Sequence, residues 1–363
     1  MRSIETMPPL TPERMHGGRP ILEPHPGHAW ESRVVLNPAA VLVHDHAVLD
    51  RVAARCGLPE AAVQRLQEAG GACVMLYRAQ GEVDPVKQAA PSSLGLAVFT
   101  PELELVYRHP VPVLRPEEAF HNLGVEDARC TPVGDTYYLY YTGYSTDDLA
   151  DPAAPRRVRI CLATTTDFFD WTLHGPVEGD LNDVDNKNAA LFPEPVDGTW
   201  YLFHRPMEGP DAMTIHLAEA ASPAGPWRSC GKLFESYAYR EFARSWIGAG
   251  GPPLALGDGR FLAIYHQGHY TPEGTREYDL AAALLDLRAE NAVRARIEPL
   301  MRPSGAAEQV GDPELGVDNV LFTCANYRFG DDLLIPYAAA DSRIFGARVN
   351  VLALVAALET GAR

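Results

Sequence analysis

Two adjacent carboxylates, Glu126 and Asp127, stand with Arg129 in the stretch HNLGVEDARC, which spans residues 121–130. The run that follows, TPVGDTYYLYYTGYS, has the composition of a strand, a tight turn and a second strand. A carboxyl group ahead of such a strand could transfer protons in a reaction. It could equally cap the turn, which is the ordinary structural role of an aspartate at that place.

Other polar side chains stand at equivalent places along the chain, at the ends of strand-like runs. They are Asn37, Arg78, Lys187, His204, Arg205, His266, His269 and Asp341. If the strands bring these ends together, few carboxylates and many cations share one pocket. The elements that position them therefore decide what the residues can do.

Four segments share one plan, in which an apolar strand meets a Gly/Asp turn and a strand rich in aromatic and branched residues follows. They are CTPVGDTYYLYYTGYS, AALFPEPVDGTWYLFHRP, PPLALGDGRFLAIYHQG and VLFTCANYRFGDDLLIPYAAAD, with turns at intervals of roughly sixty to seventy residues. A second kind of unit lies between them, in VRICLATTTDFFDWTLHG, MTIHLAEAASPAGPWRS and YDLAAALLDLR, so each repeat holds about four strands. A diverged first copy, from VVLNPAAVLV to LGLAVFTPELEL, makes five repeats.

These repeats predict an all-β fold, a five-bladed β-propeller, because a lone blade cannot bury both faces and must stack on its neighbours. A sandwich and a β-helix are the alternatives. The innermost strand of each propeller blade lines the central channel, so the polar strand ends should meet in one axial pocket.

The predicted organisation is an N-terminal extension over residues 1–30 and a single five-bladed propeller domain over residues 31–363. Residues 46–71 have apolar positions at helical spacing, interrupted by Gly57 and Pro59, and predict a small helical insertion in the first blade. The final segment, VNVLALVAALETGAR, is expected to supply a strand that closes the ring and a short helical tail.

Composition excludes several classes of partner. The formal net charge of -17 argues against nucleic acid, which requires a basic face. No apolar run approaches the length of about eighteen residues that crosses a bilayer, so no membrane partner is expected. The first residues lack the apolar core and cleavage site of a secretory signal, which favours a cytoplasmic location. The six cysteines lack CxxC spacing, so neither a disulfide framework nor a metal site is predicted.

Five stretches of the sequence resemble glycoside hydrolase family 130, the β-mannoside phosphorylases and their hydrolase relatives. They are GVEDARCTPVGDTYYLYYTGYS, NKNAALFPEPVDGTWYLFHRP, IGAGGPPLALGDGRFLAIYHQG, YDLAAALLDL and PYAAAD, in the family's order. The resemblance covers the chain from Asn37 to Asp341, and the family's fold is a five-bladed propeller. It implies that Asp127 is the general acid, protonating the leaving oxygen through a hydroxyl of the bound mannose.

The resemblance also implies the two sides of the pocket. Lys187, Arg205 and His266 would bind phosphate. The residues expected to bind sugar are Asn37, Arg78, Glu126, Arg129, His204 and Asp341, and Arg78 and Arg129 could instead orient the acid. Phosphate is already an anionic nucleophile, so cations and forked hydrogen bonds suffice to hold it.

The expected function is therefore inverting phosphorolysis of a β-mannoside, with inorganic phosphate as co-substrate, no cofactor, and α-mannose 1-phosphate as product. An inverting β-mannosidase on the same scaffold would need a second carboxylate roughly 6.5 to 9.5 Å from the acid. Glu235 and Glu241 are the candidates for that base. A non-catalytic sugar-binding propeller is the third alternative.

Three positions depart from the family's pattern. Ala128 stands where members commonly have proline, and Asn188 where aspartate follows the lysine. Trp246 stands where phosphorylases often have a lysine, and loss of that cation keeps hydrolysis a rival. The glycosidic linkage and a homo-oligomeric state stay open, as does the insertion at residues 46–71, which could shape the acceptor site or mediate a subunit contact.

Overall fold

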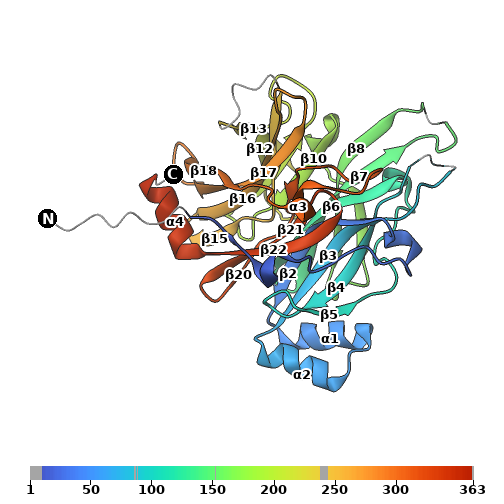
Figure 1. The fold of residues 1–363 in the computed structure, drawn as a ribbon. Helices are drawn as coiled ribbons and strands as arrows, with labels where there is room; N and C mark the ends of the chain where they lie inside the picture. The colour runs from blue at the N-terminus through green and yellow to red at the C-terminus, as the bar shows by residue number, and fades with distance from the viewer. Residues whose placement is uncertain (1–9, 86, 88, 152, 238–243, 362–363) are drawn as a thin grey trace.

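The computed structural model describes residues 10–361 except residues 86, 88, 152 and 238–243 (Figure 1). Within them the chain forms five antiparallel sheets, here called blades 1 to 5, and each blade contacts the next around a common axis. The fold is the five-bladed β-propeller that the repeats predict.

Blades 1 and 2 follow the chain outward from the axis. Blade 1 consists of β2 (Val34–Val43), β3 (Ala72–Gln80), β4 (Ser93–Phe99) and β5 (Leu105–Arg108). Blade 2 consists of β6 (Gly124–Val133), β7 (Thr136–Thr146), β8 (Arg156–Thr165) and β9 (Thr172–Pro176). The carboxylates of the first motif therefore lie near the start of an innermost strand, at the end away from the turn between β6 and β7.

Blades 3 and 4 repeat the plan. Blade 3 consists of β10 (Asn186–Leu191), β11 (Trp200–Pro206), β12 (Ile215–Ala220) and β13 (Arg228–Phe234). Blade 4 consists of β14 (Ser245–Ala249), β16 (Arg260–Tyr270), β17 (Arg276–Asp286) and β18 (Val293–Met301), with the short β15 (Leu254–Gly257) also paired to β16.

Blade 5 is completed by the other end of the chain. It consists of β19 (Leu321–Phe322), β21 (Asp332–Ala339), β22 (Arg343–Asn350) and β1 (Glu13–Arg14), with β20 (Tyr327–Phe329) also paired to β21. The strand that closes the ring is thus β1, which pairs with β22, and not the C-terminal segment. That segment ends β22 and then forms α4 (Val351–Thr360), because the Asn350 side chain caps the helix by accepting from the amide of Ala353.

Hydrophobic clusters fill the contacts between successive blades. Between blades 1 and 2, for example, Val74 and Leu96 pack with Leu139 and Tyr141. Four further clusters join blades 2 and 3, 3 and 4, 4 and 5, and 5 and 1 in the same way. Each blade is buried on both faces, which explains why the strands read as nearly continuous apolar runs rather than as alternating ones.

The predicted helical insertion is present as α1 (His46–Cys56) and α2 (Glu60–Glu68), at the lower edge of the molecule in Figure 1. Asp45 caps α1, and Gly57 ends it in the left-handed conformation, with φ 64°. The insertion connects the end of β2 to the start of β3, where Val43 pairs with Ala72. It therefore emerges from blade 1 at the end of β2 opposite to Asn37.

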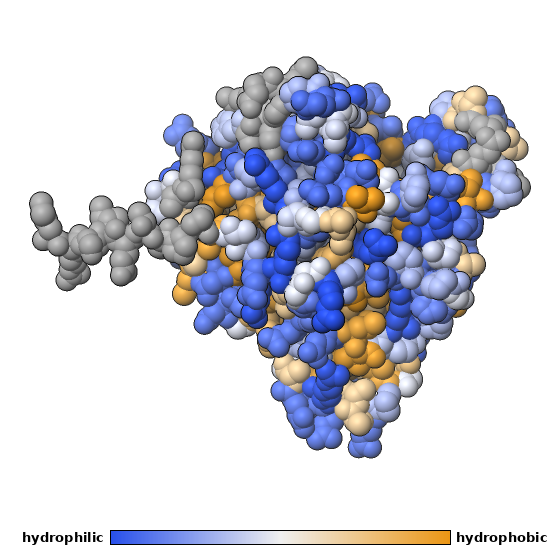
Figure 2. Space-filling model, in the orientation of Figure 1, coloured by the Kyte–Doolittle hydropathy of each residue, from blue (hydrophilic) through white to orange (hydrophobic). Residues whose placement is uncertain are grey.

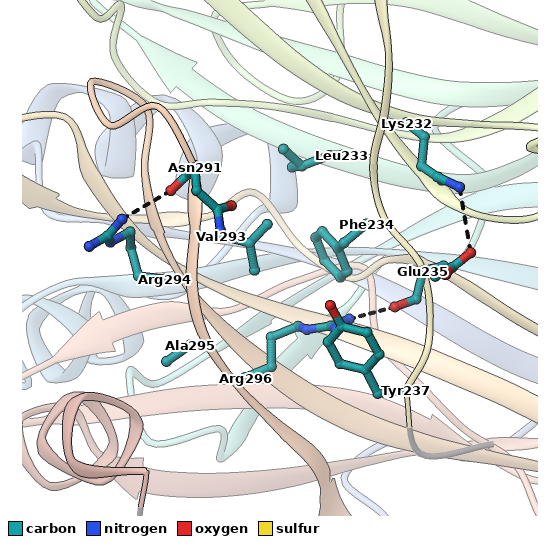
Figure 3. Close-up of a pocket in the computed structure, with 10 residues that line it drawn as sticks. All are labelled: Lys232, Leu233, Phe234, Glu235, Tyr237, Asn291, Val293, Arg294, Ala295 and Arg296. Carbon is teal, nitrogen blue, oxygen red and sulfur yellow. Dashed lines mark hydrogen bonds and ion pairs between the residues drawn. The ribbon is translucent and has the colours of Figure 1, made fainter. Parts of the chain in front are cut away.

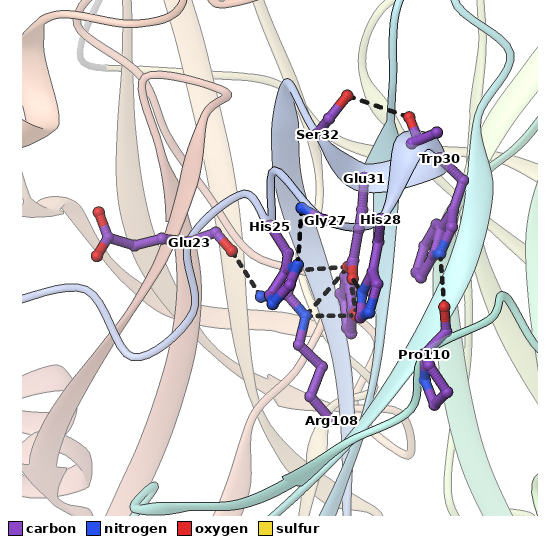
Figure 4. Close-up of polar contacts among 11 residues, drawn as sticks. Glu23, His25, Gly27, His28, Trp30, Glu31, Ser32, Arg108 and Pro110 are labelled. Carbon is purple, nitrogen blue, oxygen red and sulfur yellow. Dashed lines mark hydrogen bonds and ion pairs between the residues drawn. The ribbon is translucent and has the colours of Figure 1, made fainter.

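The N-terminal segment is attached to blade 1 by a buried polar cluster (Figure 4). The carboxylate of Glu31 is fully buried and accepts from Nδ1 of His28 at 2.6 Å, from the hydroxyl of Tyr77 at 2.7 Å and from Nη2 of Arg108 at 2.5 Å. Residues 10–31 thus contact both blade 5 and blade 1. The boundary drawn at residue 31 stays a prediction.

The remaining elements are short. They are the 3-10 turns Met15–Gly18, Ala29–Glu31, Ala119–His121 and Leu181–Asp183, and α3 (Ala306–Gln309). Hydrophilic residues cover most of the face shown in Figure 2, with hydrophobic ones in smaller groups between them. Among the described residues, no helix combines the length and apolarity that a bilayer crossing requires.

Candidate active site

Three innermost strands carry the same irregularity at the same place. The ladders of β2, β6 and β10 with their neighbours each skip two residues, and the first skipped residue is Asn37, Asp127 or Asn188. All three have left-handed backbones, with φ 48°, 48° and 58°. Asn and Asp are the residues other than glycine that tolerate this conformation best. These bulges bring an amide or a carboxylate from blades 1, 2 and 3 to one end of the channel.

Asp127 is held by two neighbouring side chains. Its Oδ1 accepts from Nδ2 of Asn37 at 2.6 Å and from Nη1 of Arg78 at 3.1 Å. Nη2 of Arg78 also donates to Oε1 of Glu126 at 2.9 Å, so one guanidinium bridges both carboxylates of the motif. Ser92 completes this side, because its hydroxyl donates to the same Oε1 at 3.1 Å. Asp127 is only 7 % exposed.

Asp341 is the second carboxylic acid of the cluster and is partly buried, in the turn between β21 and β22. Burial raises its pKa to about 6, and the charge of Asp127 adds to the effect while Arg78 opposes it. Burial also opposes ionisation of Asp127. The positive charges of Arg78 and Arg129, together with the hydrogen bond from Asn37, outweigh this effect, so the pKa of Asp127 is lowered. The two acids therefore ionise at different pH values, although they lie in one field of charges.

Lys187, Arg205 and His266 form the cationic side of the cluster, on blades 3 and 4. Nη1 of Arg205 lies 3.4 Å from Nε2 of His266, and both side chains are almost completely buried. Burial and the neighbouring Arg205 lower the pKa of Lys187 to about 8, while Asp127 and Glu126 oppose the shift. Burial and the charge of Arg205 hold the pKa of His266 well below its usual range, so its ring is neutral.

The ring of His266 also constrains the neighbouring donors. Its Nε2 faces Nη1 of Arg205 and, at 3.4 Å, Nδ2 of Asn188, so Nε2 accepts and Nδ1 carries the proton. Among the described residues, Nε of Arg205 and Nδ1 of His266 are buried without a partner, and so is Oδ1 of Asn37 on the carboxylate side. Buried polar atoms are normally satisfied, so this arrangement is typical of a ligand site.

Two other predicted sugar ligands differ in their placement. Arg129 is brought into the cluster, but it is 1 % exposed, and its guanidinium donates to backbone carbonyl groups. His204 is not brought together with the others. It contacts Asn186 through Nδ1 at 3.0 Å and packs against His216 of β12, because successive residues of β11 point to opposite faces and Arg205 takes the face toward His266. Burial lowers the pKa of His204 to about 3.

Three further residues belong to the cluster and were not predicted as ligands. Asn188 occupies the third bulge, and its position follows from the sequence rule that also places Asn37 and Asp127. The ring of Tyr278 lies 6.1 Å from that of His266, and its hydroxyl raises the pKa of Arg205 against the dominant effect of burial. Arg276 interacts with Asp341. Arg276 and Tyr278 lie at the start of β17 (Arg276–Asp286). The stretch YDLAAALLDL is predicted as a strand of the repeat and carries part of the family resemblance, but neither feature indicates a ligand in it.

The first candidate base for a hydrolase lies elsewhere. Glu235 lines a cavity of 490 Å³ between the outermost strands of blades 3 and 4 (Figure 3). Its carboxylate lies 3.5 Å from Nζ of Lys232, and its carbonyl accepts from Nη1 of Arg296 at 2.5 Å. Since β13 and β18 are the strands farthest from the axis, the cavity is separate from the Asp127 cluster. Glu241, the other candidate, lies outside the described residues.

Trp246 occupies the position where phosphorylases of the family often have a lysine. It is 7 % exposed and packs against Tyr270 and Tyr278, with ring centroids 5.5 and 5.3 Å apart. A second cavity, of 330 Å³, lies at the other end of the innermost strands. Its lining comes from all five blades and includes Leu42, Cys130, Pro193, Pro252 and Tyr327. None of the predicted site residues, all of which are described, lines it.

Comparison with known proteins identifies the scaffold. A family model for glycoside hydrolase family 130, described as β-1,4-mannooligosaccharide phosphorylase, matches residues 61–359. A 1,2-β-oligomannan phosphorylase from Thermoanaerobacter sp. (strain X514) is 30% identical over 330 residues, which are 90% of this chain and 93% of that protein.

Solved structures share the fold. The β-1,2-mannobiose phosphorylase of Listeria innocua, in complex with β-1,2-mannobiose, superposes with a TM-score of 0.70 at 21% identity, over 96% of this chain and 99% of that one. A structure described with family 130 glycoside hydrolases that target β-1,2 mannosidic linkages in Candida mannan superposes with a TM-score of 0.72 at 19% identity, over 96% of each chain. On the family match and the 30% identical relative, the chain belongs to glycoside hydrolase family 130.

Proposed function

We propose that the protein is an inverting β-mannoside phosphorylase that transfers a mannosyl group to inorganic phosphate and releases α-mannose 1-phosphate. The observation that carries the proposal is the division of one buried cluster into two sides. Asp127, Glu126 and Asp341 gather on one side, and Lys187, Arg205 and His266 on the other. The first side suits sugar hydroxyls, and the second suits an anion.

The sugar side would hold the mannosyl unit next to Asp127. A departing sugar alkoxide needs a proton, and a positioned acid contributes a factor of about 10² to 10⁴ in rate. Asp127 would deliver that proton to the leaving oxygen through a hydroxyl of the bound mannose. Glu126 is anchored by Arg78 and Ser92, so it is oriented to accept hydrogen bonds from sugar hydroxyls.

The cationic side would hold phosphate against the anomeric carbon. A phosphate oxygen forms the new bond to that carbon while the bond to the leaving oxygen breaks on the opposite face, which inverts the configuration. Arg205 and Lys187 bring positive charge, and the neutral His266 brings a donor at Nδ1. No base is required, since the nucleophile is already an anion.

The lowered pKa of Asp127 belongs to the ligand-free cluster, where Arg78 and Arg129 stabilise its ionised form. A phosphate dianion beside Lys187 and Arg205 adds negative charge to the same cluster and shifts the pKa of Asp127 upward. Phosphate binding therefore prepares the acid as well as the nucleophile. This coupling predicts that the general acid is competent only when phosphate is bound.

The first substrate to test is a β-1,2-linked mannoside. The relatives from Thermoanaerobacter and Listeria innocua are named for β-1,2-linked oligomannan and mannobiose, whereas the family description names β-1,4-linked mannooligosaccharides. A cytoplasmic location and a homo-oligomeric state remain predictions from the sequence.

Hydrolysis is the second candidate, because Asp341 is a further, partly buried carboxyl group in the cluster and a structural neighbour is described with hydrolases. In that reaction Asp341 would activate water in place of Glu235. The two functions differ in one requirement: the hydrolase works without phosphate.

The deciding experiment incubates the purified protein with β-1,2- and β-1,4-mannobiose, with and without phosphate, and identifies the products by NMR. We expect α-mannose 1-phosphate, formed only with phosphate. Asp127→Asn should lower kcat by a factor of about 10² or more without changing the Tm substantially. Free mannose formed equally in both buffers would replace phosphorolysis by hydrolysis. If the protein binds the sugar but forms no product, and Asp127→Asn does not change that binding, the protein is a non-catalytic sugar-binding propeller.

A further inference from the structure

Arg129 spans the channel between two blades that are not neighbours. It stands on β6 of blade 2, and its Nε and Nη2 donate to the carbonyls of Gly250 at 3.0 Å and Ala249 at 2.8 Å, at the end of β14 in blade 4. Its Nη1 donates to the carbonyl of Asp127 at 2.6 Å. All three nitrogen atoms of the guanidinium are thus bonded to main-chain oxygen atoms, in a side chain that is 1 % exposed.

The carbonyl of Asp127 needs such a partner. The ladder between β6 and β7 skips Asp127 and Ala128, so this carbonyl takes no part in strand pairing. A buried carbonyl without a donor is unfavourable, and the left-handed backbone of Asp127, with φ 48°, adds strain that the surroundings must offset. Nη1 of Arg129 supplies the missing donor at the strained residue itself.

Arg129 also differs from the other cations of the cluster in its partners. Arg78 donates to the carboxylates of Glu126 and Asp127. Arg129 donates to three main-chain carbonyls and, from Nη2, to Oδ1 of Asn188 at 3.5 Å, and none of these acceptors is a carboxylate. The guanidinium lies over the ring of Phe322, 5.8 Å from its centroid. Each nitrogen atom of its guanidinium already donates a hydrogen bond and the side chain is 1 % exposed, so Arg129 is poorly placed to bind a sugar.

We propose that Arg129 is a positioning residue for the reaction, which ties blade 2 to blade 4 across the channel and fixes the backbone of Asp127 so that the carboxylate points at the substrate. This inference rests on the proposed function, in which Asp127 is the acid. Lysine cannot take the place of Arg129, because a single ammonium lacks the planar fork that reaches three carbonyls at once.

The test compares Arg129→Lys and Arg129→Gln with the wild-type enzyme. The matched control is Arg260→Lys, since Arg260 also lies on a propeller strand, β16, but is bonded to the exposed Glu359 of α4. Steady-state kinetics with β-1,2-mannobiose and phosphate should show kcat lowered about 100-fold in both Arg129 variants, because a small displacement of the acid suffices for that loss. Both KM values should stay within about threefold of wild type.

The pH profile separates positioning from mere damage to the fold. The charge of Arg129 lowers the pKa of Asp127, so its removal in Arg129→Gln should move the alkaline limb of the kcat profile to higher pH. Retention of the charge in Arg129→Lys should move it less. A KM for mannobiose raised about tenfold with kcat retained would overturn the inference and make Arg129 a sugar ligand. Wild-type kcat in a folded variant would overturn it as well.

Two further results keep the conclusions distinct. If Asp127→Asn turns over like the wild type, the proposed function fails; if Asp127→Asn is inactive and the Arg129 variants are fully active, only the inference about Arg129 fails. If neither Arg129 variant folds, a crystal structure of Asp127→Asn with mannobiose and phosphate decides. The guanidinium should remain on its three carbonyls, and a nitrogen within about 3.5 Å of a ligand oxygen would overturn the inference.

Discussion

At the scale of single residues, the site depends on two acids whose pKa values are shifted in opposite directions. Asp127 is bonded to Asn37 and Arg78, which stabilise its charge, whereas burial keeps the proton on Asp341 up to a pKa of about 6. Environments that separate the pKa values of neighbouring acids are typical of acid–base sites. A shifted pKa changes the free energy of unfolding with pH, so the arrangement can be tested without substrate.

Asp341→Asn should stabilise the protein at neutral pH. The pKa of Asp341 rises from 3.8 to about 6 on folding, so its contribution is fully present below pH 3.8 and is lost as the pH rises through 6. Ionisation of this partly buried carboxyl group therefore costs the wild type up to about 3 kcal/mol near pH 7. Asparagine avoids this cost, and the gain should vanish near pH 4.

Urea unfolding of Asp341→Asn and wild type at both pH values measures the effect. The exposed Glu208→Gln serves as a control for loss of one negative charge at the surface. A stability difference that is the same near pH 4 and near pH 7 would show that Asp341 does not titrate in this range.

The residue scale also shows what the sequence could reveal. Asn37, Asp127 and Asn188 recur at one position of three repeats, so a rule that Asn and Asp mark left-handed bulges predicts three inward-facing groups. The contrast between Arg205 and His204 also follows from strand alternation, once one of them is placed. Arg129 could not be assigned, because its partners are carbonyl groups of blade 4, more than a hundred residues away.

At the scale of elements, the helical hairpin is separated from the site by the length of a strand. Asn37 and Val43 are six residues apart on β2, which corresponds to about 20 Å. The hairpin leaves at Val43 and returns at Ala72, beside blade 2, where Arg55 binds Asp170. The geometry thus favours packing or subunit contact over a role in the acceptor site.

Replacing residues 44–71 by an Asn-Gly turn should leave the catalytic constants within about twofold of wild type. The Tm should fall, because Val48, Leu49, Val52 and Leu66 belong to the hydrophobic cluster between blades 1 and 2. Kinetics with mannobiose and with longer oligomers, together with light scattering, test both expectations. A changed preference between these substrates would place the hairpin at the acceptor site after all, and a changed mass in solution would identify a subunit contact.

At the scale of the whole molecule, the ring is held together by residues from both ends of the chain. The five repeats and their order were predictable, because each blade repeats one turn chemistry and one apolar pattern. The closing strand was not, since β1 is two residues long, and its sequence, Glu13–Arg14, carries no strand pattern. Its pairing with β22 is decided by the rest of the ring.

Glu31 attaches the N-terminal segment, which carries β1, to blade 1. Glu31→Gln should therefore destabilise the whole propeller. The carboxylate is fully buried and accepts from His28, Tyr77 and Arg108. Glutamine keeps one acceptor oxygen but places an amide among donors and leaves Arg108 without its charge partner. Breaking a buried ion pair in this way costs roughly 3 to 5 kcal/mol.

The matched control is Glu23→Gln, because Glu23 lies on the same N-terminal segment as Glu31 but is largely exposed. Its carboxylate pairs with Arg343 of β22 at 3.2 Å, and such exposed pairs contribute about 0 to 1 kcal/mol. The free energy of unfolding of both variants, from urea titration, compares a buried anchor with a surface one. A single cooperative transition shifted to lower urea in Glu31→Gln alone would show that blades 5 and 1 unfold with the rest of the ring. Equal stability of the two variants would mean that the pairing of β1 with β22 suffices to close it.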